Sequence, residues 1–150
     1  MKIAIGCDHG GFKLKAELLE FLQSQGYEYK DFGCYDTSPV DYNDYALPVA
    51  ESVAAGEYDF GILLCGTGIG MSIVANKVKG IRCAHCQDVF SAKATRQHND
   101  ANVIALGERV IGAGLMKEIV GTFLKTPFSN EERHIRRVNK IKELENKNFK

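Results

Sequence analysis

Short apolar runs alternate with segments of helical period along most of the chain, and this alternation constrains the fold more than any other feature. The apolar runs expected to form strands are 2–7, 27–32, 59–65, 81–86 and 102–106. The segments expected to form the helices between and after them are 12–22, 45–55, 69–78, 89–97 and 114–124. Strands that alternate with helices of this length predict parallel strands, right-handed crossovers and helices on both faces of the sheet. The expected fold class is α/β, a three-layer sandwich around a five-stranded parallel sheet.

Two segments fall outside this alternation. Residues 33–44 are polar, turn-rich and tyrosine-bearing, which favours a loop over a site, although a plain connection can have the same composition. Residues 129–150 are typical of a charged helix that begins with Ser129 as N-cap and Glu132 three residues later. This helix has few apolar positions, so we expect it to pack on another surface or another subunit. A length of 150 residues without repeat, linker or low-complexity stretch indicates a single domain, 1–150.

The overall charge is balanced, with 19 Lys and Arg residues against 19 Asp and Glu residues. No excess charge therefore draws the protein to nucleic acid or to an anionic membrane, and small or specific partners are expected. The first apolar run is too short for a signal peptide or a membrane span, which predicts a cytoplasmic location. Five cysteines, an odd number in a chain large enough for its own core, predict free thiols.

A glycine-rich turn, CGTGIGMS over residues 65–72, is the strongest local signal for chemistry. It lies between an apolar run and a helical segment, where backbone N–H groups and the helix N-terminus can bind an anion. Ligands of such sheets also bind beyond the carboxyl ends of the strands. The alternative is a tight turn that needs glycine for its backbone geometry alone. The turn has neither the Gly-Lys-Ser/Thr of a Walker sequence nor a GxGxxG dinucleotide fingerprint.

Cys65 opens this turn, where the same N–H groups would favour a thiolate and so prepare a base or a nucleophile. A cysteine that ends an apolar strand is, however, often only a small buried hydrophobic residue. Cys83 and Cys86 have the spacing of a redox motif or of half a zinc site, but they lie in an expected strand. Because no second ligand pair of comparable spacing exists, we expect no metal site.

Other candidate residues follow the remaining strands or lie on the tail. Asp8 and His9 come directly after the first strand, where an aspartate can also serve as a helix cap. His98 and Asn99 precede the fifth strand, where they suit a helix end equally well. Cations suited to a phosphate are also present, although such residues more often form a solvated basic face. They are Arg109, Arg133 and Arg137.

Five segments together resemble ribose-5-phosphate isomerase B, of the larger group that includes the galactose-6-phosphate isomerase subunits. They are GCDHGG, DYNDYA, ILLCGTGIGMSIVANK, RQHNDANVIALGERVIG and ERHIRRV, and they follow this order over nearly the whole chain. The resemblance implies a Rossmann-like α/β domain, a homodimer or homotetramer with sites at the subunit interface, and no cofactor. It also implies the interconversion of D-ribose 5-phosphate and D-ribulose 5-phosphate through an enediolate.

The resemblance also implies roles for the residues at matching positions. Cys65 would be the base, and His98, assisted by Asp8, would open the furanose ring. The oxyanion hole would be formed by Thr67 and the backbone of Gly66, Gly68, Ile69 and Gly70. The residues expected near the sugar are Asp41, Tyr42 and Asn99. Those expected to bind the phosphate are His9, Arg109, Arg133 and Arg137.

Some family members use a glutamate base directly after the last glycine of the turn. This chain has Met71 at that position and Cys65 before the turn, so it resembles the cysteine type. The other functions considered are a non-catalytic module that binds a phosphorylated ligand and a flavodoxin-like redox protein. An isomerase of another sugar phosphate, such as allose 6-phosphate, is a further alternative. Isomerase activity would exclude the binding module, and a panel of substrates would identify the sugar.

Overall fold

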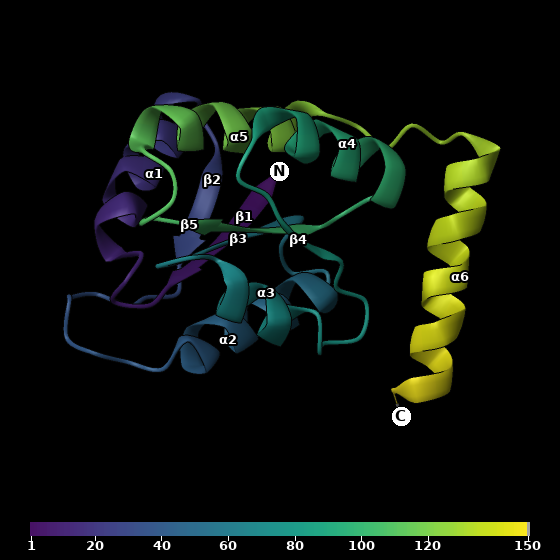
Figure 1. Cartoon of the computed structure of the whole chain (residues 1–150), viewed down its shortest axis with the longest axis horizontal. Coiled ribbons are helices and arrows are strands. Elements are labelled where there is room, and N and C mark those ends of the chain that lie inside the picture. Colours follow the sequence, from purple (N-terminus) through teal and green to yellow (C-terminus); the bar gives the residue numbers. More distant parts are fainter. Residues whose placement is uncertain (150) are drawn as a thin grey trace.

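The computed structural model describes residues 1–149, which form a five-stranded parallel sheet flanked by helices (Figure 1). The strands are β1 (Lys2–Cys7), β2 (Glu28–Asp31), β3 (Phe60–Cys65), β4 (Cys83–His85) and β5 (Val103–Gly107). The helices are α1 (Phe12–Ser24), α2 (Tyr42–Ala54), α3 (Ile69–Ala75), α4 (Val89–Asn99), α5 (Ala113–Lys125) and α6 (Glu132–Asn148). Helices α1, α4 and α5 cover one face of the sheet, and α2 and α3 cover the other (Figure 1). The predicted α/β class and three-layer arrangement are confirmed.

The strands are ordered β2-β1-β3-β5-β4, and every neighbouring pair is parallel. The chain first moves outward from β1 to β2 and then returns past β1 to β3, so the direction of winding reverses between β1 and β3. In open parallel sheets, ligands bind beyond the strand ends at such a reversal point. Asp8 and Cys65 lie at the carboxyl ends of these two strands.

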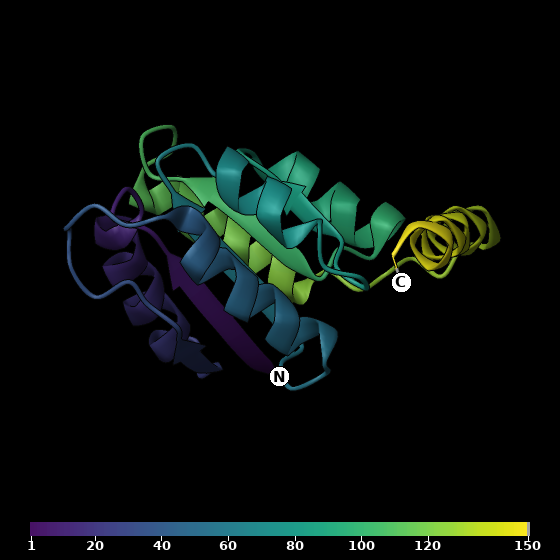
Figure 2. The same ribbon diagram turned by 90° about the horizontal axis from the view of Figure 1, so that it is seen from below.

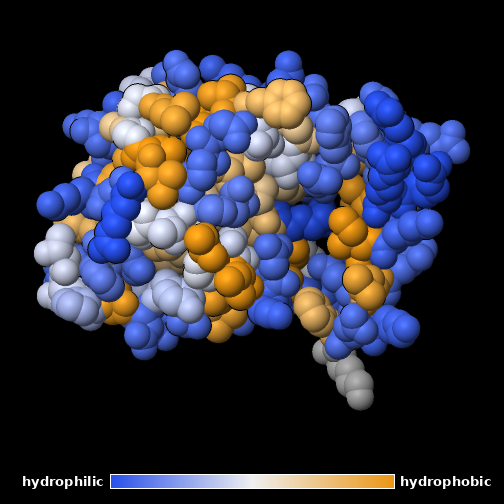
Figure 3. Space-filling view, in the orientation of Figure 1, coloured by the Kyte–Doolittle hydropathy of each residue, from blue (hydrophilic) through white to orange (hydrophobic). Residues whose placement is uncertain are grey.

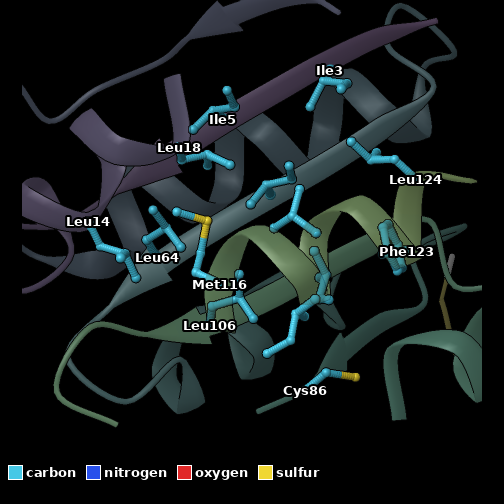
Figure 4. Close-up of a cluster of buried hydrophobic side chains, with 14 of the residues drawn as sticks. Ile3, Ile5, Leu14, Leu18, Leu64, Cys86, Leu106, Met116, Phe123 and Leu124 are labelled. Carbon is cyan, nitrogen blue, oxygen red and sulfur yellow. The ribbon is translucent and has the colours of Figure 1, made fainter. Parts of the chain in front are cut away.

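The core consists of two apolar clusters, one on each face of the sheet. Successive side chains of a strand point to opposite faces. Ile3 and Ile5 therefore face α1 and α5, where they belong to one cluster with Phe123 (Figure 4). Ala4 points the other way and packs with Val49 of α2. Because both faces of the sheet are buried, its central strands are nearly continuous apolar runs, which is the pattern visible in the sequence.

Helix α6 projects from the end of the molecule beyond α4 (Figures 1 and 2). The expectation that Ser129 caps this helix was wrong, because the helix begins at Glu132 and Glu131 occupies the N-cap position. The Ser129 hydroxyl instead lies 2.7 Å from Nδ1 of His134 and accepts a hydrogen bond from the Glu131 N–H at 3.3 Å. The predicted helix extended to Lys150, which lies outside the described residues.

The other boundaries differ from the expected ones by a few residues. Helix α2 begins at Tyr42, with Asp41 as its N-cap. The segment 33–44 is therefore a loop only up to Asp41, and its last three residues are helical. Strand β4 comprises only the three residues Cys83–His85 because it lies at the edge of the sheet and pairs with β5 alone. Within residues 1–149, no helix combines the length and apolar character required to cross a membrane.

Candidate active site

Two loops meet where β1 and β3 end. Cys65 pairs with Gly107 of β5, and the Asp8 N–H donates to the carbonyl oxygen of Leu64 at 3.2 Å. A side chain at Gly10 would place its Cβ 2.9 Å from the Gly66 nitrogen, closer than real Cβ contacts. The loop after β1 therefore lies directly on the glycine-rich turn, and glycine is required at this contact. Asp8 is 8% exposed and accepts a hydrogen bond from the Gly10 N–H at 2.8 Å.

Cys65 is 5% exposed, and its sulfur is the acceptor for a backbone amide of the turn. The Gly68 N–H donates to Cys65 Sγ at 2.9 Å. Gly68 has a φ of 81°, in the left-handed region that favours glycine. A Cβ there would also lie 2.9 Å from the carbonyl carbon of Leu106. Glycine at this position thus serves both the tight turn and the hydrogen bond to the sulfur, so the two interpretations of the motif are compatible.

The remainder of the turn leads into the first turn of α3. Thr67 is exposed, and its Oγ1 accepts a hydrogen bond from the Ile69 N–H at 3.3 Å. The N–H groups of Gly70 and Met71 belong to the first helical turn, where no partner exists within a helix. A Cβ at Gly70 would lie 3.0 Å from ring atoms of Tyr42, so the Tyr42 ring covers this part of the turn. Asp41 directly precedes Tyr42 in the chain and is the N-cap of α2.

Arg109 and His9 border the same site. The Arg109 N–H donates to the Gly66 carbonyl oxygen at 3.0 Å, and the guanidinium lies over Gly66, 3.1 Å from where a Cβ would be. Arg109 is exposed and has no ion-pair partner within residues 1–149. His9 Nδ1 accepts a hydrogen bond from the Val40 N–H at 3.1 Å, which leaves Nε2 as a donor. His9 therefore ties the loop between β2 and α2 to the edge of the site.

The remaining candidates form a second group at the other end of the sheet. His98 and Asn99 end α4, and the Asn99 carbonyl oxygen accepts a hydrogen bond from Arg82, which precedes β4. Val103 begins β5 and Gly107 ends it, so the two groups are separated by at least four strand residues, about 13 Å. Arg133 and Arg137 lie on α6, whose first turns pack beside the end of α4. Within one chain, neither group can contact the other.

His134 joins α6 to this second group. The His98 and His134 rings are 4.5 Å apart between centroids and tilted by 35°. Burial lowers the pKa of His134, and the nearby positive charges of His98 and Arg133 lower it further. The second group therefore concentrates imidazole and guanidinium groups on one side of the molecule.

Sequence reasoning missed two side chains that hold the glycine-rich turn. His85 Nε2 lies 2.7 Å from the Thr67 carbonyl oxygen, and Gln87 Nε2 donates to the same oxygen at 2.9 Å. Both residues follow or end β4, so the rule that ligands and site residues gather at carboxyl strand ends could have identified them. His85 lies between Cys83 and Cys86, and only the spacing of these two cysteines drew attention in the sequence. Within residues 1–149, no three His, Cys, Asp or Glu side chains are grouped closely enough to bind a metal.

A groove of about 700 Å³ lies between β4, α4 and α6, away from Cys65. Its lining includes Asn99 and three large hydrophobic residues that are exposed. These are Phe90, Ile141 and Leu144, which are 81%, 39% and 57% exposed. Hydrophobic residues also line the side of α6 that faces the rest of the molecule (Figure 3).

Comparison with known proteins gives consistent relatives. Residues 3–141 match the Ribose/Galactose Isomerase family. The chain is 49% identical to ribose-5-phosphate isomerase B of Escherichia coli, with 96% of both chains covered. It is 48% identical to D-erythrulose-4-phosphate isomerase of Pectobacterium atrosepticum, with 85% of both chains covered.

Solved structures agree with these relatives. Ribose-5-phosphate isomerase B of Clostridium thermocellum is 54% identical and superimposes with a TM-score of 0.95, with 98% of this chain and 99% of that chain covered. The Mycoplasma genitalium enzyme with bound ribulose-5-phosphate is 39% identical, has a TM-score of 0.92, and matches over 97% of this chain and 96% of that chain. The extent of these matches, together with the glycine-rich turn and Cys65 at the carboxyl edge of the sheet, shows that the chain belongs to the ribose/galactose isomerase family.

Proposed function

We propose that this protein interconverts D-ribose 5-phosphate and D-ribulose 5-phosphate through an enediolate, with Cys65 as the base. The observation that carries the proposal is the hydrogen bond from the Gly68 N–H to Cys65 Sγ. This hydrogen bond lies beside Arg109, at the point where the direction of winding of the sheet reverses. The sugar is taken from the names of the relatives, since three of them are named for ribose 5-phosphate and one of these three holds ribulose-5-phosphate.

The reaction requires one base and donors directed at a developing oxyanion. Cys65, as the thiolate, removes the proton from C2 of the open-chain aldose, and the electrons of that bond form the C1–C2 double bond of the enediolate. The hydroxyl proton moves from O2 to O1, Cys65 returns its proton to C1, and the carbonyl group forms at C2. Thr67 and the N–H groups of residues 66–70 stabilise the negative charge on the substrate oxygen during both transfers. Proton transfer by a positioned side chain typically accelerates such a reaction by about 10²–10⁴-fold.

The phosphate binds at a distance from the bond changes. In the chain that supplies Cys65, Arg109 and the Nε2–H of His9 provide donors for it, and Asp41 and Tyr42 border the sugar. Binding energy from such a remote group orients the reacting carbons without taking part in the reaction. No metal or cofactor is required by this chemistry.

The site is completed by a second copy of the chain. His98, Asn99, Arg133 and Arg137 lie too far from Cys65 of their own chain, so the partner subunit supplies them in a homodimer. Two features support this arrangement: the apolar groove between β4, α4 and α6, and the projecting α6 helix with exposed Ile141 and Leu144. His98 then protonates and deprotonates the furanose oxygens during ring opening, and Asp8 assists it.

The proposal also includes the metabolic pathway and the cellular location of the protein. The reaction places the protein in pentose phosphate metabolism, and the five free cysteines fit the reducing cytoplasm. The preferred sugar is the least constrained part, because a relative named for D-erythrulose 4-phosphate is almost as similar as one named for ribose 5-phosphate. Turnover of ribose 5-phosphate, allose 6-phosphate and erythrulose 4-phosphate by the purified protein ranks these substrates.

The direct test is Cys65→Ala, with turnover and substrate binding measured separately. Turnover should fall by at least about 10²-fold, the contribution typical of a positioned base. Binding of ribose 5-phosphate should persist, because Arg109 and His9 are unchanged. Near-normal turnover would remove the base assignment. Wild-type protein that binds sugar phosphates but isomerises none of them would instead favour the non-catalytic binding module.

A further inference from the structure

The peptide between Thr67 and Gly68 is held from both sides. On one side, its N–H donates to Cys65 Sγ at 2.9 Å. On the other side, its carbonyl oxygen accepts a hydrogen bond from Gln87 Nε2 at 2.9 Å and lies 2.7 Å from His85 Nε2. His85 and Gln87 are 18 and 20 residues away from Thr67 in the chain, so these contacts depend on the tertiary structure.

A planar trans peptide links these two sets of contacts mechanically. The C=O and N–H bonds of such a unit point in opposite directions and rotate together. Side chains that fix the direction of the Thr67 carbonyl therefore also fix the direction of the Gly68 N–H. Hydrogen bonds to the carbonyl oxygen also polarise the peptide, which strengthens the N–H as a donor.

The positions of His85 and Gln87 are themselves fixed. The Gly107 N–H donates to Gln87 Oε1 at 3.4 Å, which orients the amide so that Nε2 points to Thr67. Asp88 then caps α4 by accepting from the Ser91 N–H at 2.6 Å, which anchors the chain directly after Gln87. His85 belongs to β4 and pairs with Ala105 of β5. His85 Nε2 also lies 2.8 Å from Gln87 Nε2, so the two side chains contact each other as well as the Thr67 carbonyl oxygen. His85 donates to that oxygen when its proton is on Nε2, and Gln87 then donates to the same oxygen from beside it.

The Thr67–Gly68 peptide needs this support because Gly68 restricts it little. Gly68 has no Cβ and adopts a left-handed φ of 81°, and glycine reaches many other conformations at similar energy. Thr67 is exposed, so solvent can replace the contacts to its carbonyl oxygen if the peptide rotates.

We propose that His85 and Gln87 are positioning residues that hold the Thr67–Gly68 peptide with its N–H directed at Cys65 Sγ, so that the amide stabilises negative charge on the sulfur. The catalytic part of this inference depends on the proposed function, in which Cys65 is the base. The structural part, control of the Cys65 thiolate by two side chains of the β4–α4 segment, does not depend on the reaction.

The test measures the reactivity of Cys65 directly, as alkylation by iodoacetamide across a pH series with mass-spectrometric detection of the peptide containing Cys65. Gln87→Met and His85→Met remove the donors without adding charge. His85→Gln retains an amide donor at a similar reach and serves as the conservative variant. Gln23→Met, on the exposed surface of α1, is the matched control.

We expect both loss variants to slow Cys65 alkylation at neutral pH about three- to tenfold, less than the full contribution of a hydrogen bond to a charged group. Their alkylation profiles should move to higher pH, and kcat should fall while KM changes little. The Gly68 amide proton resonance should also move upfield. His85→Gln should recover most of these effects, and Gln23→Met should match the wild type.

Unchanged Cys65 alkylation and an unchanged Gly68 resonance in folded loss variants would overturn the inference, even if kcat fell. If one methionine variant failed to fold, the other would decide the question through the same two measurements, because His85 and Gln87 each contact the Thr67 carbonyl oxygen. Slower alkylation in the loss variants, combined with normal turnover by Cys65→Ala, would uphold the positioning role and reject Cys65 as the base.

Discussion

Mixing two inactive variants tests whether the active site is shared between subunits. Cys65→Ala removes the proposed base, and His98→Asn removes the proposed ring-opening imidazole. Within one chain, these side chains are separated by at least the length of β5, about 13 Å, which no hydrogen bond spans. Each homodimer should therefore contain two defective sites.

A mixed dimer should contain one intact site. That site takes Cys65 from the His98→Asn chain and His98 from the Cys65→Ala chain, while the second site carries both substitutions. In a two-fold dimer the interface presents the same surfaces in both directions, so random association makes roughly half of the dimers mixed. The total activity should recover to roughly one quarter of the wild-type value per chain, and an isolated mixed dimer should reach roughly one half.

The assay uses coexpressed chains with two different affinity tags, so that tandem purification isolates the mixed dimer. Turnover of ribose 5-phosphate is compared with that of each parent homodimer and of a tagged wild-type dimer. A purified mixed dimer as inactive as its parents would refute the reasoning, because His98 would then act within its own chain or not at all. A fully active monomer in sedimentation would refute it as well.

Three further outcomes follow from the same geometry. Arg137→Ala should raise KM about tenfold or more with little change in kcat, which steady-state kinetics measures. This pattern is expected for a phosphate contact that is equally strong in the ground and transition states. His98→Asn should impair turnover of cyclic ribose 5-phosphate more than deuterium exchange from solvent into C1 of ribulose 5-phosphate, which enters in open form; a proportional loss of both would contradict ring opening. The pKa of His134 is lowered from 6.5, chiefly by burial, so the neutral form of this side chain stabilises the α4–α6 contact above pH 6.5. Hydrogen exchange of α6 should therefore accelerate as the pH falls below 6.5.

The layers of the fold could be predicted from the sequence because their signal is local. Each central strand is buried on both faces, so segments such as Lys2–Cys7 and Phe60–Cys65 are continuous apolar runs that need no knowledge of their neighbours. Parallel strands joined by helices also place their carboxyl ends at one edge. That rule alone was enough to bring Asp8 and Cys65 together.

Predictions that depended on a competing partner were less accurate. Ser129 followed by Glu132 has the local pattern of a capping box, but the Ser129 hydroxyl lies 2.7 Å from His134 and the helix begins later. A local sequence pattern does not show which of two available hydrogen-bond partners a hydroxyl group contacts, because tertiary packing around the hydroxyl decides between them.

The sequence by itself determined the layers, the glycine-rich turn and the cysteine that opens it. Only the tertiary structure decided which other side chains reach that turn. Strand order brings His85 and Gln87 onto the Thr67 carbonyl from 18 and 20 residues away, and it places His98 at the far end of the sheet. The physical reason is that a helix returns the chain across the sheet, so residues that follow a strand and residues that precede the next one lie at opposite edges, however similar their chemistry is in the sequence.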